Sequence, residues 1–230
     1  MIEKEFKVKH YIALGLLFIA IIISGIQPLE FEAYLLHQAG TVFMVILLFI
    51  IFKKIGLDFL SFTFYLLFLL IHIIGAHYLY SYVPYNDWIQ QVFHFNLDQY
   101  MGWSRNMYDR LVHLAYGVLL YPLIYRVFQV WLPTARPFSL FLLVVQFVMA
   151  SSVFYELIEW VIAIGLSPEQ AENYNGQQGD MWDAHKDMLL ATIGAILYGL
   201  IALLTTPKNQ TINKLKKRSL SAFYMLSQIP

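Results

Sequence analysis

The sequence predicts an all-α fold: a polytopic integral membrane bundle of six transmembrane helices with both termini in the cytoplasm. Of the 230 residues, 59% are hydrophobic and only 13% are charged, whereas soluble domains carry about a quarter charged residues. Six apolar runs also approach the roughly 20 residues with which a helix crosses the hydrocarbon core. Within a bilayer such runs form helices, because a helix satisfies its own backbone hydrogen bonds.

The six spans follow one another along most of the chain. The first is slightly short, and Lys4, Lys7 and Lys9 precede it as they would precede the apolar core of a signal peptide. No small-x-small cleavage site follows, so we interpret this run as a retained helix. The predicted spans cover approximately residues 9–26, 33–52, 59–80, 109–130, 138–165 and 181–204.

The segments between the spans do not divide the chain into further domains. Residues 81–108 and 166–180 are predicted to be polar loops. We therefore expect one transmembrane domain, residues 1–206, and a short basic cytoplasmic tail, residues 207–230. The absence of cysteine excludes disulfides and thiolate metal ligands, and the net charge of zero argues against a nucleic-acid partner. The expected partner is the lipid bilayer.

The placement of Lys and Arg predicts the orientation. With the N-terminus inside, twelve of the fifteen Lys and Arg residues lie on the cytoplasmic side, and only Arg105, Arg110 and Lys186 lie on the outer side. Cytoplasmic loops of membrane proteins carry such an excess. In this orientation twelve of the fifteen Asp and Glu residues and six of the seven histidines fall in the outer half. The sequence thus predicts an apolar inner half and a polar outer half.

Ionisable residues on four different helices are predicted to reach a similar depth. At 1.5 Å of rise per residue, His113 lies about 7 Å below the outer boundary, Glu159 and Asp187 about 9 Å, and His72 and Glu156 about 12 to 14 Å. A charged group at membrane depth costs about 2.5 to 3.5 kcal/mol on insertion scales. These carboxylates must therefore be paired, protonated or neutralised by a cation.

Three helices carry ionisable pairs at spacings that place both side chains on one face. The pairs are Asp109 with His113, Glu156 with Glu159, and Asp183 with Asp187. A mixture of His and carboxylate ligands suits Zn, Mn or Fe. The Glu-x-x-His pair of di-iron bundles and the His-Glu-x-x-His motif of zinc proteases are both absent. The pattern indicates a functional polar site, for which a divalent metal such as Zn, Mn or Fe is one interpretation.

Structural interpretations compete for several of these residues. Asp180 directly precedes a predicted helix, which favours an N-cap over a ligand, and Asp109 can be either. Asp183 suits the positive end of a helix. Lys186 and Arg110 can extend to the membrane interface with their long side chains.

Glu156, Glu159 and Asp187 are predicted to lie too deep for capping. Their structural alternative is an ion pair, or a carboxyl–histidine hydrogen bond, that fixes helix packing. Intramembrane ionisable groups are more often functional, so we favour a functional site.

Four motifs follow one another from the third to the sixth predicted helix: His72-Ile-Ile-Gly75-Ala-His77-Tyr78, Tyr108-Asp109-Arg110-Leu-Val-His113, Tyr155-Glu156-Leu-Ile-Glu159-Trp160 and Gln178-Gly179-Asp180-Met-Trp182-Asp183-Ala. Together they resemble the YjdF-type family of bacterial inner-membrane proteins. The resemblance covers nearly the whole chain and implies a multi-pass protein of the bacterial cytoplasmic membrane. Because the family is a domain of unknown function, the resemblance implies little about mechanism and does not establish metal binding.

The leading functional hypothesis is a membrane-embedded, metal-dependent enzyme of hydrolase type whose site opens to the outer face. The bound metal would activate water as a Lewis acid, and the shallow site suits a lipid or envelope precursor. The expected metal ligands are His113, Glu156, Glu159 and Asp187, with Asp109, Asp183 and His72 as further ligands or catalytic general bases. Arg110 and Lys186 are expected to bind an anionic group of the substrate.

Two alternatives stay open at this point. Chains of carboxylates and histidines also serve as ion or proton pathways in transporters, but the inner halves of the predicted helices lack matching polar residues and no inverted repeat is visible. The other alternative is a structural or partner-binding membrane protein in which the polar cluster only holds the helices together.

Overall fold

The computed structural model describes residues 1–205 of the chain, and the predicted basic tail, residues 207–230, lies outside the described residues. The regular elements within residues 1–205 are helices, together with one isolated antiparallel bridge between Glu3 and Leu57. The helices are α1 (Val8–Ser24), α2 (Phe31–Lys54), α3 (Phe59–His77), α4 (Tyr85–Phe93), α5 (Leu97–Met101), α6 (Tyr108–Trp131), α7 (Pro137–Ile164), α8 (Pro168–Asn175) and α9 (Asp183–Thr205).

Each predicted span coincides with one long helix, which confirms the all-α membrane bundle. By length and composition, α2, α3, α6, α7 and α9 can each cross a membrane, and α1 is a shorter apolar helix of 17 residues. Their ends differ from the predicted ends by only a few residues. The number of six spans and the cytoplasmic placement of the termini stay predictions.

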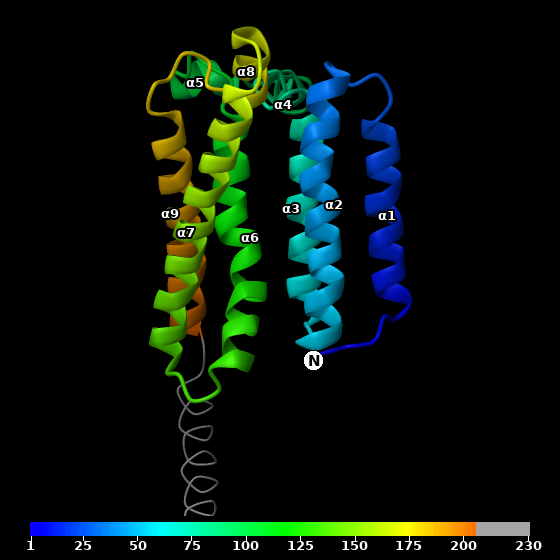
Figure 1. The fold of residues 1–230 in the computed structure, drawn as a ribbon, viewed down its shortest axis with the longest axis vertical. Coiled ribbons are helices and arrows are strands. Elements are labelled where there is room, and N and C mark those ends of the chain that lie inside the picture. The colour runs from blue at the N-terminus through cyan, green and yellow to red at the C-terminus, as the bar shows by residue number, and fades with distance from the viewer. Residues whose placement is uncertain (206–230) are drawn as a thin grey trace, which may run out of the picture.

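The long helices form two groups that run side by side (Figure 1). One group contains α1, α2 and α3 and the other contains α6, α7 and α9, and the packing of α3 against α6 joins them. The short helices α4, α5 and α8 lie together at one end of the bundle, which we call the polar end (Figure 1).

The two segments predicted to be polar loops contain short helices instead. The segment 81–108 forms α4 and α5, and the segment 166–180 forms α8. The side chain of Ser167 caps the start of α8 by accepting a hydrogen bond from the amide of Gln170. These helices have nine residues or fewer, so a search for long apolar runs does not detect them.

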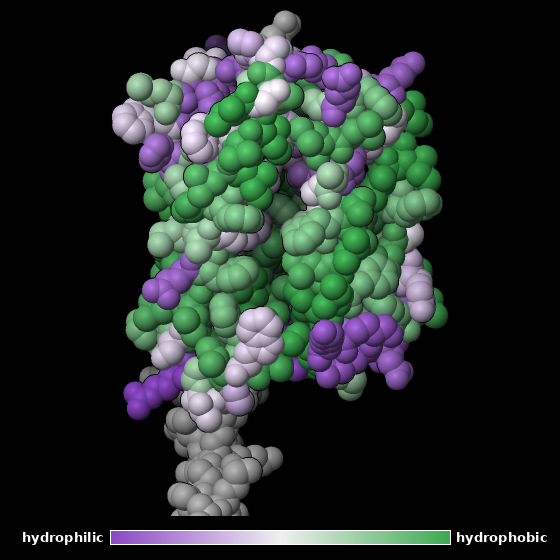
Figure 2. Space-filling model, in the orientation of Figure 1, coloured by the Kyte–Doolittle hydropathy of each residue, from purple (hydrophilic) through white to green (hydrophobic). Residues whose placement is uncertain are grey.

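Apolar side chains cover the flank of the bundle. Figure 2 shows a hydrophobic surface between its two ends, with most of the hydrophilic residues gathered near those ends. Large side chains such as Phe18 and Phe43 are more than 60% exposed along this flank. Such exposure suits contact with lipid hydrocarbon, and it explains why much of the apolar composition is not used in a core.

Two glycines bring the backbones of α6 and α9 into direct contact. A Cβ atom on Gly117 would overlap the backbone of Ala191 and Ala195, and a Cβ atom on Gly194 would overlap the carbonyl oxygen of Leu114. Small residues at helix crossings permit such close approach in membranes. This crossing fixes α6 and α9 relative to each other, and these two helices carry most of the ionisable residues discussed below.

Candidate functional site

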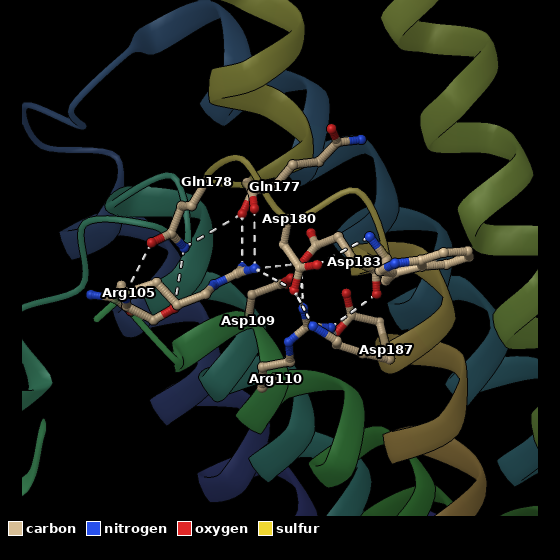
Figure 3. A network of polar contacts seen from close by, with 12 residues as sticks. Arg105, Asp109, Arg110, Gln177, Gln178, Asp180, Asp183 and Asp187 are labelled. Carbon is tan, nitrogen blue, oxygen red and sulfur yellow. Dashed lines mark hydrogen bonds and ion pairs between the residues drawn. The ribbon is translucent and has the colours of Figure 1, made fainter. Parts of the chain in front are cut away.

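The ionisable residues of α6 and α9 meet at the polar end of the bundle (Figure 3). Asp109 and Arg110 lie in the first turn of α6, while Asp183 and Asp187 lie in the first two turns of α9. Both helices therefore begin beside one another and direct their first side chains into the space between them. The close crossing lower in the bundle makes this arrangement possible.

Arg110 is the centre of a buried ion-pair network. Its side chain is almost fully buried, with 6% of the residue exposed. Nη1 donates hydrogen bonds to the Asp187 carboxylate at 2.8 Å and to the Asp183 carbonyl at 2.9 Å. Nη2 donates to the carboxylates of Asp183 at 2.5 Å and Asp180 at 3.1 Å. One guanidinium group thus holds three aspartates of the α9 N-terminal region (Figure 3).

Arg105, which the sequence interpretation did not identify as a site residue, extends this network. Its Nη1 donates to the Asp183 carboxylate at 2.7 Å, and its guanidinium also donates to the carbonyls of Gln177 and Gly176. The side-chain amide of Gln178 exchanges two hydrogen bonds with the backbone of Asn106. These contacts attach the segment before α9 to the segment before α6.

Asp180 makes one hydrogen bond to the backbone and one ionic contact, and because α9 begins only at Asp183 its predicted role as N-cap stays a prediction. Its carboxylate accepts a hydrogen bond from the backbone N–H of Trp182 at 3.0 Å, just before α9 begins. It also accepts a hydrogen bond from Lys186 at 2.6 Å. The Lys186 ammonium, and after it the Trp182 amide, hold the pKa of Asp180 below its usual value.

Asp109, His113 and Asp187 form a second group next to the network. One potential ligand atom from each lies within 4.8 Å of the others, and all three residues are buried. The His113 Nε2 atom is 3.6 Å from the Asp109 carboxylate and 3.9 Å from the Glu156 carboxylate of α7. Among residues 1–205, neither Asp109 nor His113 forms a side-chain hydrogen bond, and the buried Glu156 Oε1 atom also has no hydrogen-bond partner.

The distances within this group suit a shared metal ion. Two ligand atoms that each lie about 2.1 Å from one tetrahedral ion are separated by about 3.4 Å. The spacings around His113 Nε2 are close to that value and too long for hydrogen bonds. The donor set of one imidazole and two or three carboxylates is one that Zn, Mn and Fe accept.

The fixed charges divide unevenly between the two groups. Within the described residues, the cations Arg105, Arg110 and Lys186 form their ion pairs with the aspartates of the α9 region. In the same part of the chain, Asp109, Glu156 and Glu159 form no ion pair with Lys or Arg. The acids Asp109, Glu156 and Glu159 therefore form an excess of carboxylates beside the Arg110 network, which a bound cation would neutralise.

A pocket of about 270 Å³ lies beside this group, between α7 and α9. Glu156, Glu159 and Asp183 provide its charged wall. Glu159, predicted as a metal ligand, lies in this pocket and is not part of the Asp109–His113–Asp187 group.

His72 lies in a different polar group. Its Nε2 atom lies 3.2 Å from the backbone carbonyl of His37 and donates to it, because a carbonyl oxygen can only accept. In the neutral ring the Nδ1 atom then carries no proton and accepts a hydrogen bond from the Tyr80 hydroxyl. The role of His72 as a ligand or general base stays a prediction, and its ring nitrogens are engaged by α2 and by the turn after α3.

Arg110 and Lys186, predicted to bind a substrate anion, are likewise already paired with aspartates.

Comparisons with known proteins decide the family. A family model described as "Predicted membrane protein (DUF2238)" matches residues 9–208. The chain belongs to this family. It is also 31% identical over 177 residues to the inner membrane protein YjdF of Escherichia coli strain K12, an alignment that covers 76% of this chain and 80% of that protein. No solved structure matches the chain. The resemblance read from the four motifs is thus confirmed, and the protein is a multi-pass protein of the inner membrane.

Proposed function

We propose that the protein is a membrane-embedded enzyme of hydrolase type that depends on a divalent metal ion. Asp109, His113 and Asp187 would hold the ion, and Glu156 would provide a fourth ligand from α7. The observation that carries the proposal is the convergence of three buried potential ligand atoms from α6 and α9 within 4.8 Å of one another. Among residues 1–205, Asp109 and His113 form no side-chain hydrogen bond and the buried Glu156 Oε1 atom has no hydrogen-bond partner, which supports a cation at this place because buried polar groups are otherwise paired.

The surrounding residues fit this role. A divalent ion, when bound, supplies Lewis acidity toward water or toward an ester oxygen of the substrate. Arg110 positions Asp187 by a hydrogen bond of 2.8 Å and limits the negative charge of the site. The apolar flank of the bundle beside the site favours a substrate that is itself part of the membrane, such as a lipid or envelope precursor.

Metal binding by the purified full-length protein tests the proposal. We expect one Zn, Mn or Fe ion per chain after reconstitution. The substitution His113→Ala should weaken the affinity by about 100-fold or more, because even residues that only support a ligand contribute 10- to 100-fold. Isothermal titration and elemental analysis in detergent measure both quantities.

His185→Ala is the matched control. His185 lies on the same helix as Asp187, is exposed, and stacks edge-on against Trp182. Its replacement should leave the affinity unchanged. A wild-type protein that binds none of the three metals, or an H113A variant with wild-type affinity, would show that the group is not a metal site.

A structural role is the second candidate, and the ion pairs of Arg110 favour it. In that case the carboxylates only hold α6, α7 and α9 together. A Glu156→Gln variant would then keep full function in cells, whereas a metal ligand replaced by an amide would not.

A further inference from the structure

The pocket between α7 and α9 has one charged wall and one apolar wall. Glu156 and Glu159, one helical turn apart on α7, supply the charge, and Val153, Leu157 and Met188 supply the apolar surface. Val153 and Leu157 are exposed on the flank that contacts lipid. The pocket therefore extends from the membrane-facing surface of the bundle toward the proposed metal ligands.

The charged wall has unpartnered hydrogen-bond acceptors. The Glu156 Oε1 atom and the Asn175 Oδ1 atom are both buried, and neither has a hydrogen-bond partner among the described residues. Both residues line this pocket, Glu156 from α7 and Asn175 from the end of α8. The Glu156 Oε1 atom is already assigned to the proposed metal ion, so the buried Asn175 Oδ1 atom is the acceptor that requires a donor from a bound molecule or water.

The carboxyl group of Glu159 indicates that the bound donor is a cation. The cations of the polar end are occupied by the α9 aspartates, and Glu159 forms no ion pair with Lys or Arg in the described part of the chain. One divalent ion at Asp109, His113 and Asp187 leaves Glu159 without a cationic partner among the described residues. A primary ammonium carries one positive charge and three N–H donors, which suit a carboxylate such as that of Glu159 together with a neutral acceptor such as the Asn175 Oδ1 atom.

We propose that this pocket binds the primary-ammonium headgroup of an amphiphilic substrate, with Glu159 and Asn175 as acceptors and the acyl chain along Val153 and Leu157. The proposal rests on the proposed function for the assignment of the pocket as the substrate site. It goes beyond that function because it names the headgroup chemistry and gives Glu159 a role other than metal ligation.

Binding of short-chain lipids to the full-length protein in detergent tests this inference. The probes are dioctanoyl phosphatidylethanolamine and dioctanoyl phosphatidylcholine, which share acyl chains and phosphate and differ in whether the nitrogen carries N–H donors. Because each charged hydrogen bond lost at a buried site is a large effect, we expect the first to bind about tenfold or more tightly than the second. Free ethanolamine, tested alone, distinguishes a soluble amine from a lipid, and we expect no binding at the same concentration.

The substitution Glu159→Gln should abolish the preference between the two lipids. Glu172→Gln is the matched control, since Glu172 is an exposed acid of α8 outside the pocket, and the preference should persist there. Equal binding of both lipids by the wild-type protein, a preference that survives E159Q, or equal binding of ethanolamine would overturn the inference.

The outcome is separable from that of the metal experiment. His113→Ala should lose the metal and keep the lipid preference, whereas E159Q should lose the preference and keep one metal ion per chain. A wild-type protein that prefers the ammonium lipid but binds no metal would refute the proposed function alone. If E159Q instead lowers the metal content from two ions to one, Glu159 is a ligand of a second ion and the headgroup inference is wrong.

Discussion

Replacing Arg110 with alanine is expected to destabilise the protein by about 3 to 5 kcal/mol, the usual effect of removing one partner of a buried ion pair. The substitution leaves Asp183 and Asp187 facing each other at the start of α9. Asp187 is only 2% exposed, so water cannot replace the lost hydrogen bonds. The free energy of unfolding in mixed micelles, followed by circular dichroism, measures the effect.

Lys186→Ala is the control within the same network. The Lys186 side chain pairs with Asp180 at 2.6 Å but is 52% exposed, and exposed pairs contribute about 0 to 1 kcal/mol. An Arg110→Ala variant as stable as Lys186→Ala would contradict the buried network.

A second substitution distinguishes two causes of this loss: the missing attraction between Arg110 and its aspartates, and the repulsion between the carboxylates that are left unpaired. If the cost of Arg110→Ala comes from unpaired carboxylates, then Asp187→Asn in the same chain should recover a substantial part of it, because one buried charge disappears. A double variant whose loss equals the sum of the two single losses would show that Arg110 acts through packing alone.

The long helices were predictable because hydropathy is local. Each span is a continuous run of apolar residues, and membrane insertion depends on that run rather than on its neighbours. The shared faces of Asp109 with His113 and of Asp183 with Asp187 were predictable for the same reason, since helical periodicity fixes them. The structure brings Asp109, His113 and Asp187 together as those faces indicate.

The roles of the cations were not predictable in this way. Arg105 lies outside any helix, and its carboxylate partner is 78 residues further along the chain, so no periodicity relates them. Arg110 was assigned either to the interface or to a substrate because a sequence does not show whether a long side chain turns inward. Arg110 pairs with aspartates because the start of α9 lies next to it in the folded protein.

The hydrogen bond between His72 and Tyr80 depends on an unusual turn. Leu79 and Tyr80 are consecutive non-glycine residues with positive φ angles of 52° and 55°. This turn folds Tyr80 back onto α3, where its ring lies so close to Gly75 that a Cβ atom there would overlap it. No residue in the segment is a usual signal for this conformation, because glycine and asparagine normally occupy it. The hydrogen bond from Tyr80 to His72 could therefore not be anticipated.

Gly117→Ala is expected to destabilise the bundle by about 1 to 3 kcal/mol, the usual cost of adding atoms to a packed interior. The new Cβ atom would meet backbone atoms of Ala191 and Ala195, which cannot rotate away as a flexible side chain can. The helices α6 and α9 must therefore separate, and Gly117→Leu should have a larger effect. Thermal unfolding in detergent measures the stability, and Gly40→Ala in α2 is the control.

The Gly40→Ala control and the effect of Gly117→Ala on metal binding make this prediction specific. No atom lies within 4 Å of a Cβ built on Gly40, so alanine there should be neutral or stabilising through its better helix propensity. Gly117 follows His113 by one helical turn, so separation of α6 from α9 also moves His113 away from Asp187. Gly117→Ala should therefore weaken metal binding although it changes no ligand. A variant with normal stability but reduced metal affinity would indicate a local rather than a whole-helix displacement, and one with normal values of both would show that the two helices do not cross at Gly117.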